Sequence, residues 1–197
     1  MPRSHRIDHE NAFHHVMNRG AARQPIFFQD SDRALFLNCV EMACDVSQIE
    51  IHCYCLMENH FHLLVRSREG KLSTFLQQLS GRYTRLINNR TGRDGPLFRG
   101  RANSILIDTD AQLVNTTRYI HLNPVAAGIC NTPNEWHWSS SKSYSTLSAR
   151  PAWLSVETIL AMFENMAPGG GYEAFLREGV DDDTVNFYGQ PNWNSEG

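Results

Sequence analysis

Hydrophobic residues recur with helical spacing in two long stretches of the chain. The first predicts a helix that begins at Asp30 or Asp32, either of which can cap it, and runs to about Val46. The second predicts a helix from Leu72 to Asn89, with Arg82, Arg85 and Arg90 among its polar positions. Its apolar positions are Leu72, Phe75, Leu76, Leu79, Tyr83, Leu86 and Ile87. Each predicted helix therefore has one face suited to packing.

Between these helices the pattern changes to alternation, which is typical of strands. One predicted strand runs from Ile49 to Met57 and the next from His60 to Ser67. The apolar residues expected on one side of the first strand are Ile49, Ile51, Cys53, Cys55 and Met57. Glu58 and Asn59 leave room only for a short turn, so the two strands should form an antiparallel hairpin. Further strands are predicted from Phe13 to Met17 and from Asn103 to Asp108.

The order of these six elements is strand, helix, strand, strand, helix, strand. That order is the split βαβ arrangement of a ferredoxin-like antiparallel sheet with its helices on one face, an α+β fold. Another helix begins at Asp108 or Asp110, and Pro124 should end or kink it. After residue 130 the signals weaken, although Ser155 can cap a helix through Glu164, and 168–171 reads as a flexible link. We therefore predict a catalytic domain over 1–130 and a small helical or irregular extension over 131–197.

Composition narrows the class of protein. No apolar stretch approaches the ~18 residues needed to span a bilayer, and the polar N-terminus lacks the apolar core of a signal peptide. A cytoplasmic protein with no membrane partner is expected. Five cysteines without a Cys-x-x-Cys pair argue against a disulfide framework or a zinc knuckle. Cys53 and Cys55 are expected to be buried strand residues.

The net charge of −3 conceals two segments of opposite sign. Positions 66 to 101 hold nine Lys or Arg and two acidic residues, whereas from position 152 onward Arg177 stands against eight acidic residues. A basic segment can bind phosphates, although it can also be an ordinary solvated face. The candidate nucleic-acid-binding residues are Arg82, Arg85, Arg90, Arg93, Arg99 and Arg101. Aromatic residues that could stack on unpaired bases, or equally belong to the core, are Tyr83, Phe98 and Trp138.

Two pairs of residues carry candidate chemistry. His60 and His62 are two apart on a predicted strand, so both should point to the sheet face that the core does not use, where they can bind one divalent ion. Tyr119 and Asn123 are four apart and should share a helix face. The amide oxygen of Asn123 suits Mg²⁺ or Mn²⁺. The simpler alternatives are two packed histidines, and a buried tyrosine followed by an Asn-Pro helix end.

The segments around these residues resemble those of a known family. Met57 to Val65 resembles the His-hydrophobic-His motif of HUH single-tyrosine transposases, and Tyr119 to Gly128 resembles the tyrosine signature of the REP-associated branch. The resemblance covers about residues 10–145. Further segments that resemble that branch, in the same order, are Phe13 to Gly20, Gln24 to Phe27, Gly95 to Arg101 and Trp138 to Ser140.

This resemblance implies a metal-dependent enzyme that cleaves and rejoins single-stranded DNA near hairpins, of the kind found in repetitive extragenic palindromes (REPs). It implies that Tyr119 is the nucleophile and forms a 5′-phosphotyrosine intermediate, and that His60, His62 and Asn123 bind Mg²⁺ or Mn²⁺. A nucleoid-associated protein in the cytoplasm would follow. The helix of Tyr119 could cover its own sheet or that of a partner subunit, so a monomer and a homodimer both stay open.

Several alternatives remain at this point. The chain could be an active transposase that mobilises its own insertion sequence, a non-catalytic DNA-hairpin binding protein, or a metal-dependent hydrolase that uses water. Tyr83, which lies near the arginines, is an alternative nucleophile. His121, two residues from Tyr119, is a candidate base. A covalent protein–DNA adduct would distinguish the tyrosine enzyme from the hydrolase.

Overall fold

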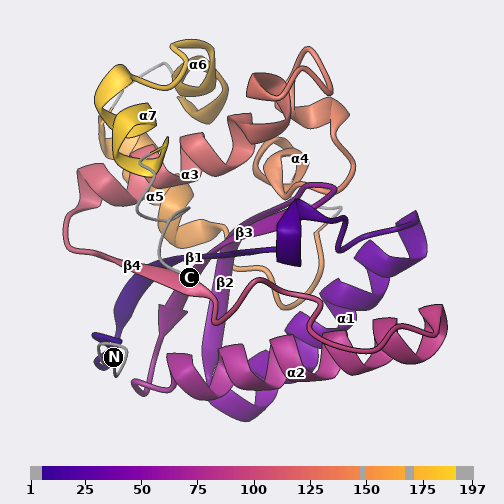
Figure 1. Cartoon of the computed structure of the whole chain (residues 1–197). Coiled ribbons are helices and arrows are strands. Elements are labelled where there is room, and N and C mark those ends of the chain that lie inside the picture. Colours follow the sequence, from indigo (N-terminus) through magenta and orange to yellow (C-terminus); the bar gives the residue numbers. More distant parts are fainter. Residues whose placement is uncertain (1–5, 147–149, 167–170, 190–197) are drawn as a thin grey trace.

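A four-stranded antiparallel sheet lies between two layers of helices in the computed structural model, which describes residues 6–146, 150–166 and 171–189 (Figure 1). The strands are β1 (Ala12–Arg19), β2 (Ile49–Leu56), β3 (His60–Ser67) and β4 (Asn103–Ile107), in the order β2-β3-β1-β4. Helices α1 (Asp30–Ser47) and α2 (Leu72–Thr91) cover one face, and α3 (Asp110–Ala126) lies over the other. The predicted ferredoxin-like fold is therefore confirmed, including the antiparallel hairpin of β2 and β3.

Local hydrogen bonds set the ends of α1 and α2. The N-cap of α1 is Gln29, one residue before the first of the two predicted caps, Asp30 and Asp32. The carboxylate of Asp32 accepts the N–H of Gln29 at 3.1 Å to complete a capping box. The first turn of α2 is bound by Asp8, whose carboxylate accepts the N–H of Leu72 at 2.8 Å. Gly92 ends α2 at a φ of 64°, a conformation that glycine adopts without strain.

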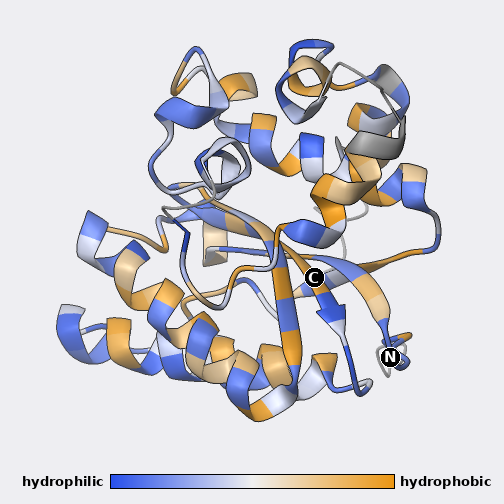
Figure 2. Ribbon diagram, turned by 180° about the vertical axis from the view of Figure 1, so that it is seen from behind, coloured by the Kyte–Doolittle hydropathy of each residue, from blue (hydrophilic) through white to orange (hydrophobic). Residues whose placement is uncertain are grey.

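The layer of α1 and α2 packs on the sheet through aromatic residues. Phe36 of α1 lies 4.8 Å from the ring of Phe61 on β3, and Phe27 and Tyr83 lie 5.4 and 5.0 Å from Phe36. Figure 2 shows hydrophobic and hydrophilic bands along these helices, as expected where one face is buried and the other solvated. None of the helices within 6–146, 150–166 and 171–189 is long and apolar enough to cross a membrane.

Strand β2 contains a β-bulge that alternation alone does not predict. Ile51 pairs with Val65, whereas Cys53 pairs with the preceding residue of β3, Leu64. Neighbouring residues of β3 point to opposite faces, so Ile51 faces α1 and α2 while Cys53 faces α3, where its thiol hydrogen-bonds Thr117. Both cysteines of β2 are buried, as predicted. Ile49 and Ile51 therefore lie on one side of β2, and Cys53 and Cys55 lie on the other. The prediction that all four share one side is wrong.

Helix α3 extends past the proline that was expected to limit it. Thr109 caps the helix by accepting the N–H of Gln112 at 3.1 Å, and Pro124 lies inside a helix that continues to Ala126. Asn123 therefore stays one helical turn after Tyr119. The sheet face beneath α3 has a core of its own, which corrects the expectation that the core uses only the opposite face. Its buried residues include Cys53, Leu64, Leu113 and Ile120.

The C-terminal extension is helical, as predicted, and packs on α3 and on β2. Its helices are α4 (Ser141–Ser145), α5 (Glu157–Met166), α6 (Gly171–Arg177) and α7 (Asp182–Gly189), and a short 3₁₀ turn, η2 (Pro133–Glu135), precedes them. The other short 3₁₀ turn, η1 (Ala21–Arg23), follows β1. The segments 138–140 and 154–155 hydrogen-bond along the outer edge of β2. The N–H of Leu56 donates to the carbonyl of Trp138 at 2.9 Å, and that of Ser155 to Ile51 at 2.9 Å. Of the link predicted at 168–171, residues 168–170 lie outside the described residues, and Gly171 begins α6.

Candidate metal and tyrosine site

The two histidines of β3 point to the same side of the sheet, toward α3. Their ring centroids are 5.1 Å apart and their planes nearly perpendicular, at 87°. His62 is 5 % exposed. Burial, reinforced by the nearby imidazoles of His60 and His15, lowers the pKa of His62 well below its usual value, and burial also lowers the pKa of His60. Both imidazoles are therefore held in the neutral form, which is the form that binds a metal ion.

Helix α3 brings its tyrosine and its asparagine to these histidines. The ring centroid of Tyr119 lies 5.7 Å from that of His62, in a perpendicular arrangement. One turn later, the side chain of Asn123 takes part in hydrogen bonding that raises the pKa of His60 and lowers that of Tyr119, in each case against the larger effect of burial. All four residues belong to one chain, so α3 covers its own sheet.

A third histidine joins the site from β1. Nε2 of His15 lies 3.0 Å from Nδ1 of His62, and the two rings are stacked with centroids 5.1 Å apart. His15 is fully buried, and its ring is 5.9 Å from that of Tyr119. Sequence reasoning missed this residue because it lies 47 positions before His62 and belongs to no repeated spacing. The signal available was its place in a predicted strand that pairs with the strand of His62.

The extension also reaches the site, through a second tyrosine that was not predicted. Tyr188 of α7 stacks on Tyr119 with ring centroids 4.6 Å apart and an angle of 30°, and its hydroxyl hydrogen-bonds Thr116. Arg118 of α3 binds the start of α7 through an ion pair with Asp181 at 3.1 Å. The acidic extension therefore covers one face of the tyrosine ring and is tied to the helix that carries it.

The predicted arginines divide between two regions. Arg82, Arg85 and Arg90 lie on α2, in the layer on the other face of the sheet from α3 (Figure 1). Arg90 is engaged in an ion pair with the buried carboxylate of Asp32 at 2.7 Å. Arg93, just after α2, lies over the ring of Phe28 at 5.7 Å.

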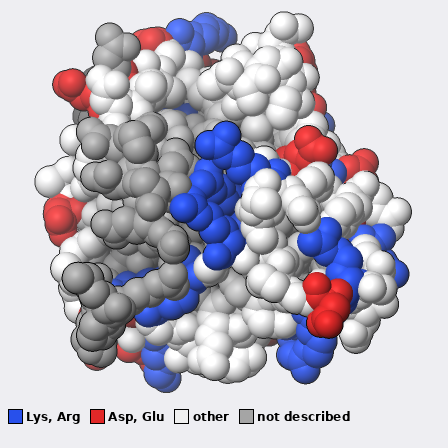
Figure 3. Space-filling model, viewed as in Figure 1, with Lys and Arg blue, Asp and Glu red and all other residues white. Residues whose placement is uncertain are grey.

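Other arginines gather near His60. The backbone N–H of Arg99 donates to the carbonyl of Arg19 at 3.0 Å. Burial lowers the pKa of Arg19, and the positive charges of Arg99 and Arg23 lower it further. Arg19 pairs directly with His60 across the sheet. On the face of the molecule drawn in Figure 3, Lys and Arg atoms gather near the middle. We call Arg19, Arg23 and Arg99 the arginine cluster; the sequence pointed only to Arg99. Arg101 adds a neighbouring charge, which helps lower the pKa of Arg6.

Three residues with suggested roles lie elsewhere in the structure. Tyr83 is fully buried beneath the sheet and its hydroxyl donates to the carbonyl of Ile26 at 2.7 Å, which removes it as a nucleophile and as a stacking platform. Phe98 is buried in the same core. His121 points away from Tyr119 and hydrogen-bonds the hydroxyls of Ser140, at 2.7 Å, and Tyr172. Burial lowers its pKa to about 3, so the suggestion that His121 acts as the base is wrong.

The residues present fit a divalent ion with three protein ligands. Two imidazole nitrogens and an amide oxygen are neutral donors that suit a first-row ion, with solvent or phosphate oxygens in the remaining positions. Within the described ranges, no group of three or more His, Cys, Asp or Glu is arranged to hold a metal ion. Asn123, whose side chain takes part in hydrogen bonding with His60, offers a neutral oxygen beside the two histidines.

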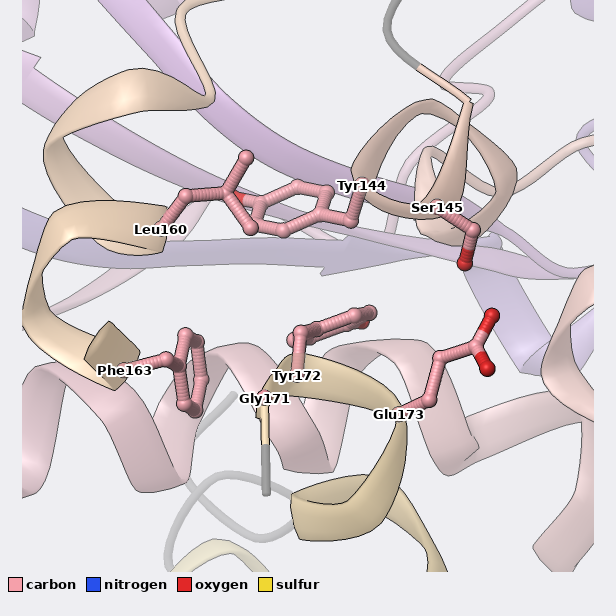
Figure 4. Close-up of a pocket in the computed structure, with 7 residues that line it drawn as sticks. All are labelled: Tyr144, Ser145, Leu160, Phe163, Gly171, Tyr172 and Glu173. Atoms are coloured by element: carbon pink, nitrogen blue, oxygen red, sulfur yellow. The ribbon is translucent and has the colours of Figure 1, made fainter. Parts of the chain in front are cut away.

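A separate cavity lies between α4, α5 and α6. Its volume is about 380 Å³. Figure 4 shows its lining, which consists of Tyr144, Ser145, Leu160, Phe163, Gly171, Tyr172 and Glu173. None of these residues is a predicted site residue, and the rings of Tyr144 and Tyr172 pack against His121 instead. The cavity therefore belongs to the packing behind α3 and not to the histidine and tyrosine site.

The fold and the paired histidines are those expected of a DNA transposase. Residues 9–122 match the family model described as "Transposase IS200 like". Because this match spans more than half of the chain, the protein belongs to the IS200-like transposase family, whose members cleave and rejoin DNA. The sequence-based resemblance is thereby confirmed at the level of the family.

Two solved structures are similar to this chain. The chain is similar to a REP-associated tyrosine transposase bound to a REP hairpin, with a TM-score of 0.64 and 14 % identity over 79 % of this chain and 92 % of the other. It is also similar to a "putative transposase" from Deinococcus radiodurans R1, with a TM-score of 0.43 and 14 % identity over 60 % of this chain and 95 % of the other. No curated protein matches.

Proposed function

We propose that this transposase cleaves and rejoins single-stranded DNA near hairpins, through a covalent intermediate on Tyr119 at a metal-dependent site. The observation that carries the proposal is the approach of the Tyr119 ring to within 5.7 Å of the His62 ring in the same chain. The hairpin substrate is supported by the similar solved structure, which is bound to a REP hairpin. Because one chain supplies every residue, the proposed site is complete in a monomer. We also propose that the protein acts in the cytoplasm, at the nucleoid.

His60, His62 and Asn123 are the proposed ligands of Mg²⁺ or Mn²⁺. When bound, the ion supplies neutralisation of charge on the scissile phosphate and orientation of the bond to be cut. Imidazole nitrogens are softer donors than the oxygens that Mg²⁺ prefers, so this ligand set favours Mn²⁺ over Mg²⁺.

Tyr119 provides the nucleophile in this proposal. Its phenol oxygen forms a bond to phosphorus while the bond from phosphorus to the 3′ oxygen breaks, which leaves a 5′-phosphotyrosine and a free 3′ hydroxyl after proton transfer. Burial raises the pKa of Tyr119, and hydrogen bonding with Asn123 opposes that increase. Asn123 therefore contributes to holding the phenol in a reactive position. Attack by a 3′ hydroxyl on the phosphotyrosine reverses the step and reseals the strand.

The arginine cluster supports binding of the DNA backbone beside this site, since Arg19 pairs across the sheet with His60. Cations of this kind give salt-dependent affinity for phosphates. The arginines on α2 would then contact DNA only where a hairpin reaches around the molecule. A transposase that mobilises its own insertion sequence would use the same chemistry on a different DNA sequence.

The proposal is tested by incubating the protein with a 3′-labelled single-stranded hairpin and Mn²⁺, followed by denaturing electrophoresis. A labelled protein band that resists denaturation and requires Mn²⁺ is the expected result. Cleaved DNA without any protein-bound label would indicate a hydrolase that uses water. Hairpin binding without cleavage would indicate a non-catalytic binding protein.

Arg90 and Arg99 make a matched pair that separates stability from DNA binding. Arg90→Ala should lower the free energy of unfolding by about 1–2 kcal/mol, because Asp32 keeps its backbone donors but loses a partly solvent-screened partner. Arg99→Ala should change stability by less than about 0.5 kcal/mol. It should weaken hairpin binding and reduce the slope of log affinity against log salt by about 1. Urea denaturation and fluorescence anisotropy measure the two effects, and a reversed pattern would assign the DNA contact to α2.

A further inference from the structure

We propose that His15 and Asn59 are positioning residues, which fix the protonated nitrogens of His62 and His60 so that both Nε2 atoms are presented to the metal. The inference rests on the proposed function, because it assigns a role beside the same ligands. It concerns two residues that touch neither the ion nor the DNA in this arrangement. The side chains of both residues reach the Nδ1 side of the histidine rings.

In the hydrogen bond between Asn59 and His60, only His60 can be the donor. Oδ1 of Asn59 lies 2.7 Å from Nδ1 of His60, and the amide nitrogen of Asn59 donates to the carbonyl of Arg23 at 3.2 Å. Since the amide nitrogen is used on Arg23, the oxygen faces the histidine, and an amide oxygen can only accept. Nδ1 of His60 must therefore carry the hydrogen. In a neutral imidazole, Nε2 then has its lone pair available for a metal ion.

The contact between His15 and His62 joins two neutral rings. With Nε2 of His15 3.0 Å from Nδ1 of His62, a single hydrogen lies between the two nitrogens. If it belongs to His62, Nε2 of His62 can bind a metal ion; if it belongs to His15, Nε2 of His62 is protonated and cannot. The first arrangement leaves Nε2 unprotonated on both ligands, and it is the one that we assign to His62.

The surroundings hold these two acceptors in place. His15 is fully buried on β1, in a strand that pairs along its whole length with β3, and Tyr188 packs edge-on against it at 4.7 Å. The backbone carbonyl of Asn59 accepts the N–H of Gly20 at 2.8 Å, which ties its turn to the end of β1. Loss of such a second layer around metal-binding histidines typically weakens metal binding by about 10–100-fold.

Matched variants separate the acceptor from the rest of each side chain. His15→Gln places an amide oxygen near the position of Nε2, whereas His15→Leu has a similar volume and no acceptor. Asn59→Asp keeps an oxygen for His60 and loses the donor to Arg23, whereas Asn59→Ala loses both. Calorimetric titration with Mn²⁺ should show affinities about 10–100-fold weaker for His15→Leu and Asn59→Ala. The affinities of His15→Gln and Asn59→Asp should remain within about threefold of the wild type, a much smaller loss than that of the acceptor-free variants.

The tautomers themselves can be measured on the unaltered protein, so the test does not depend on the variants folding. Nitrogen-15 NMR of the metal-free wild type should show a protonated Nδ1 and an unprotonated Nε2 for both His60 and His62. A protonated Nε2 on His62 overturns the assignment for His15, and equal Mn²⁺ affinity in folded His15→Leu and Asn59→Ala overturns the whole inference. If the wild type itself binds no Mn²⁺, the proposed function fails and this inference fails with it.

Discussion

Replacing Tyr119 with phenylalanine should abolish the covalent protein–DNA adduct and reduce the rate of hairpin cleavage by at least about 10⁴-fold. Phenylalanine keeps the ring that lies beside His62 and under Tyr188, so the fold and hairpin affinity should change little. Only the oxygen that attacks phosphorus is lost. Single-turnover cleavage of a labelled hairpin, with adducts counted on denaturing gels, measures the effect.

The matched control is Tyr83→Phe. Tyr83 also loses a hydroxyl in this variant, but that hydroxyl donates to a carbonyl in the core beneath the other face of the sheet. The variant should lose some stability, of the order of 1 kcal/mol, and form the adduct at the normal rate. Normal cleavage by Tyr119→Phe would show that another nucleophile, including water, does the chemistry.

Replacing both His60 and His62 with alanine should eliminate Mn²⁺-dependent cleavage, with a loss of at least about 10³-fold, while hairpin binding persists. The reason is that Asn123 alone offers a single weak ligand. Because His62 is buried, we also expect a loss of about 1–3 kcal/mol in stability from the space it leaves. Cleavage across a Mn²⁺ titration and thermal melting followed by circular dichroism measure the two effects.

The control variant is His137→Ala. His137 is exposed, and its ring packs against that of Trp138. This variant should keep both metal-dependent cleavage and stability. A collapse of the folded state in His60→Ala with His62→Ala, well beyond the expected loss, would instead indicate that the histidines serve packing. Unchanged cleavage in a folded double variant would remove them from the metal site.

The regular parts of the fold followed from local patterns. The spacing of apolar residues predicted α1 and α2 to within two residues at each end, and alternation predicted β3 over its observed span. The short turn at Glu58 and Asn59 made the hairpin the simplest arrangement. These features depend on contacts between residues close in sequence, so their signals lie within a short window. The positions of His60 and His62 on one face came from the same period of two.

Features that depend on distant contacts escaped prediction. The bulge in β2 adds a residue to a strand in which apolar residues continue at every second position past the bulge, so nothing in the sequence marks where the alternation reverses. His15 becomes part of the site only because β1 lies next to β3 in the sheet. Tyr188 reaches Tyr119 from α7, almost 70 residues later, in a segment for which the sequence predicted only a small helical or irregular extension.

The hydrogen bonds made along the outer side of β2 have a consequence for association between copies of the protein. An exposed strand at the border of a sheet is a template onto which a strand of another molecule can be added. In this chain the template is already used, by Trp138, Ser140 and Ser155. Two molecules could join their sheets through β2 only if the hydrogen bonds with Trp138, Ser140 and Ser155 were broken first. The chain itself therefore blocks β-augmentation at that edge.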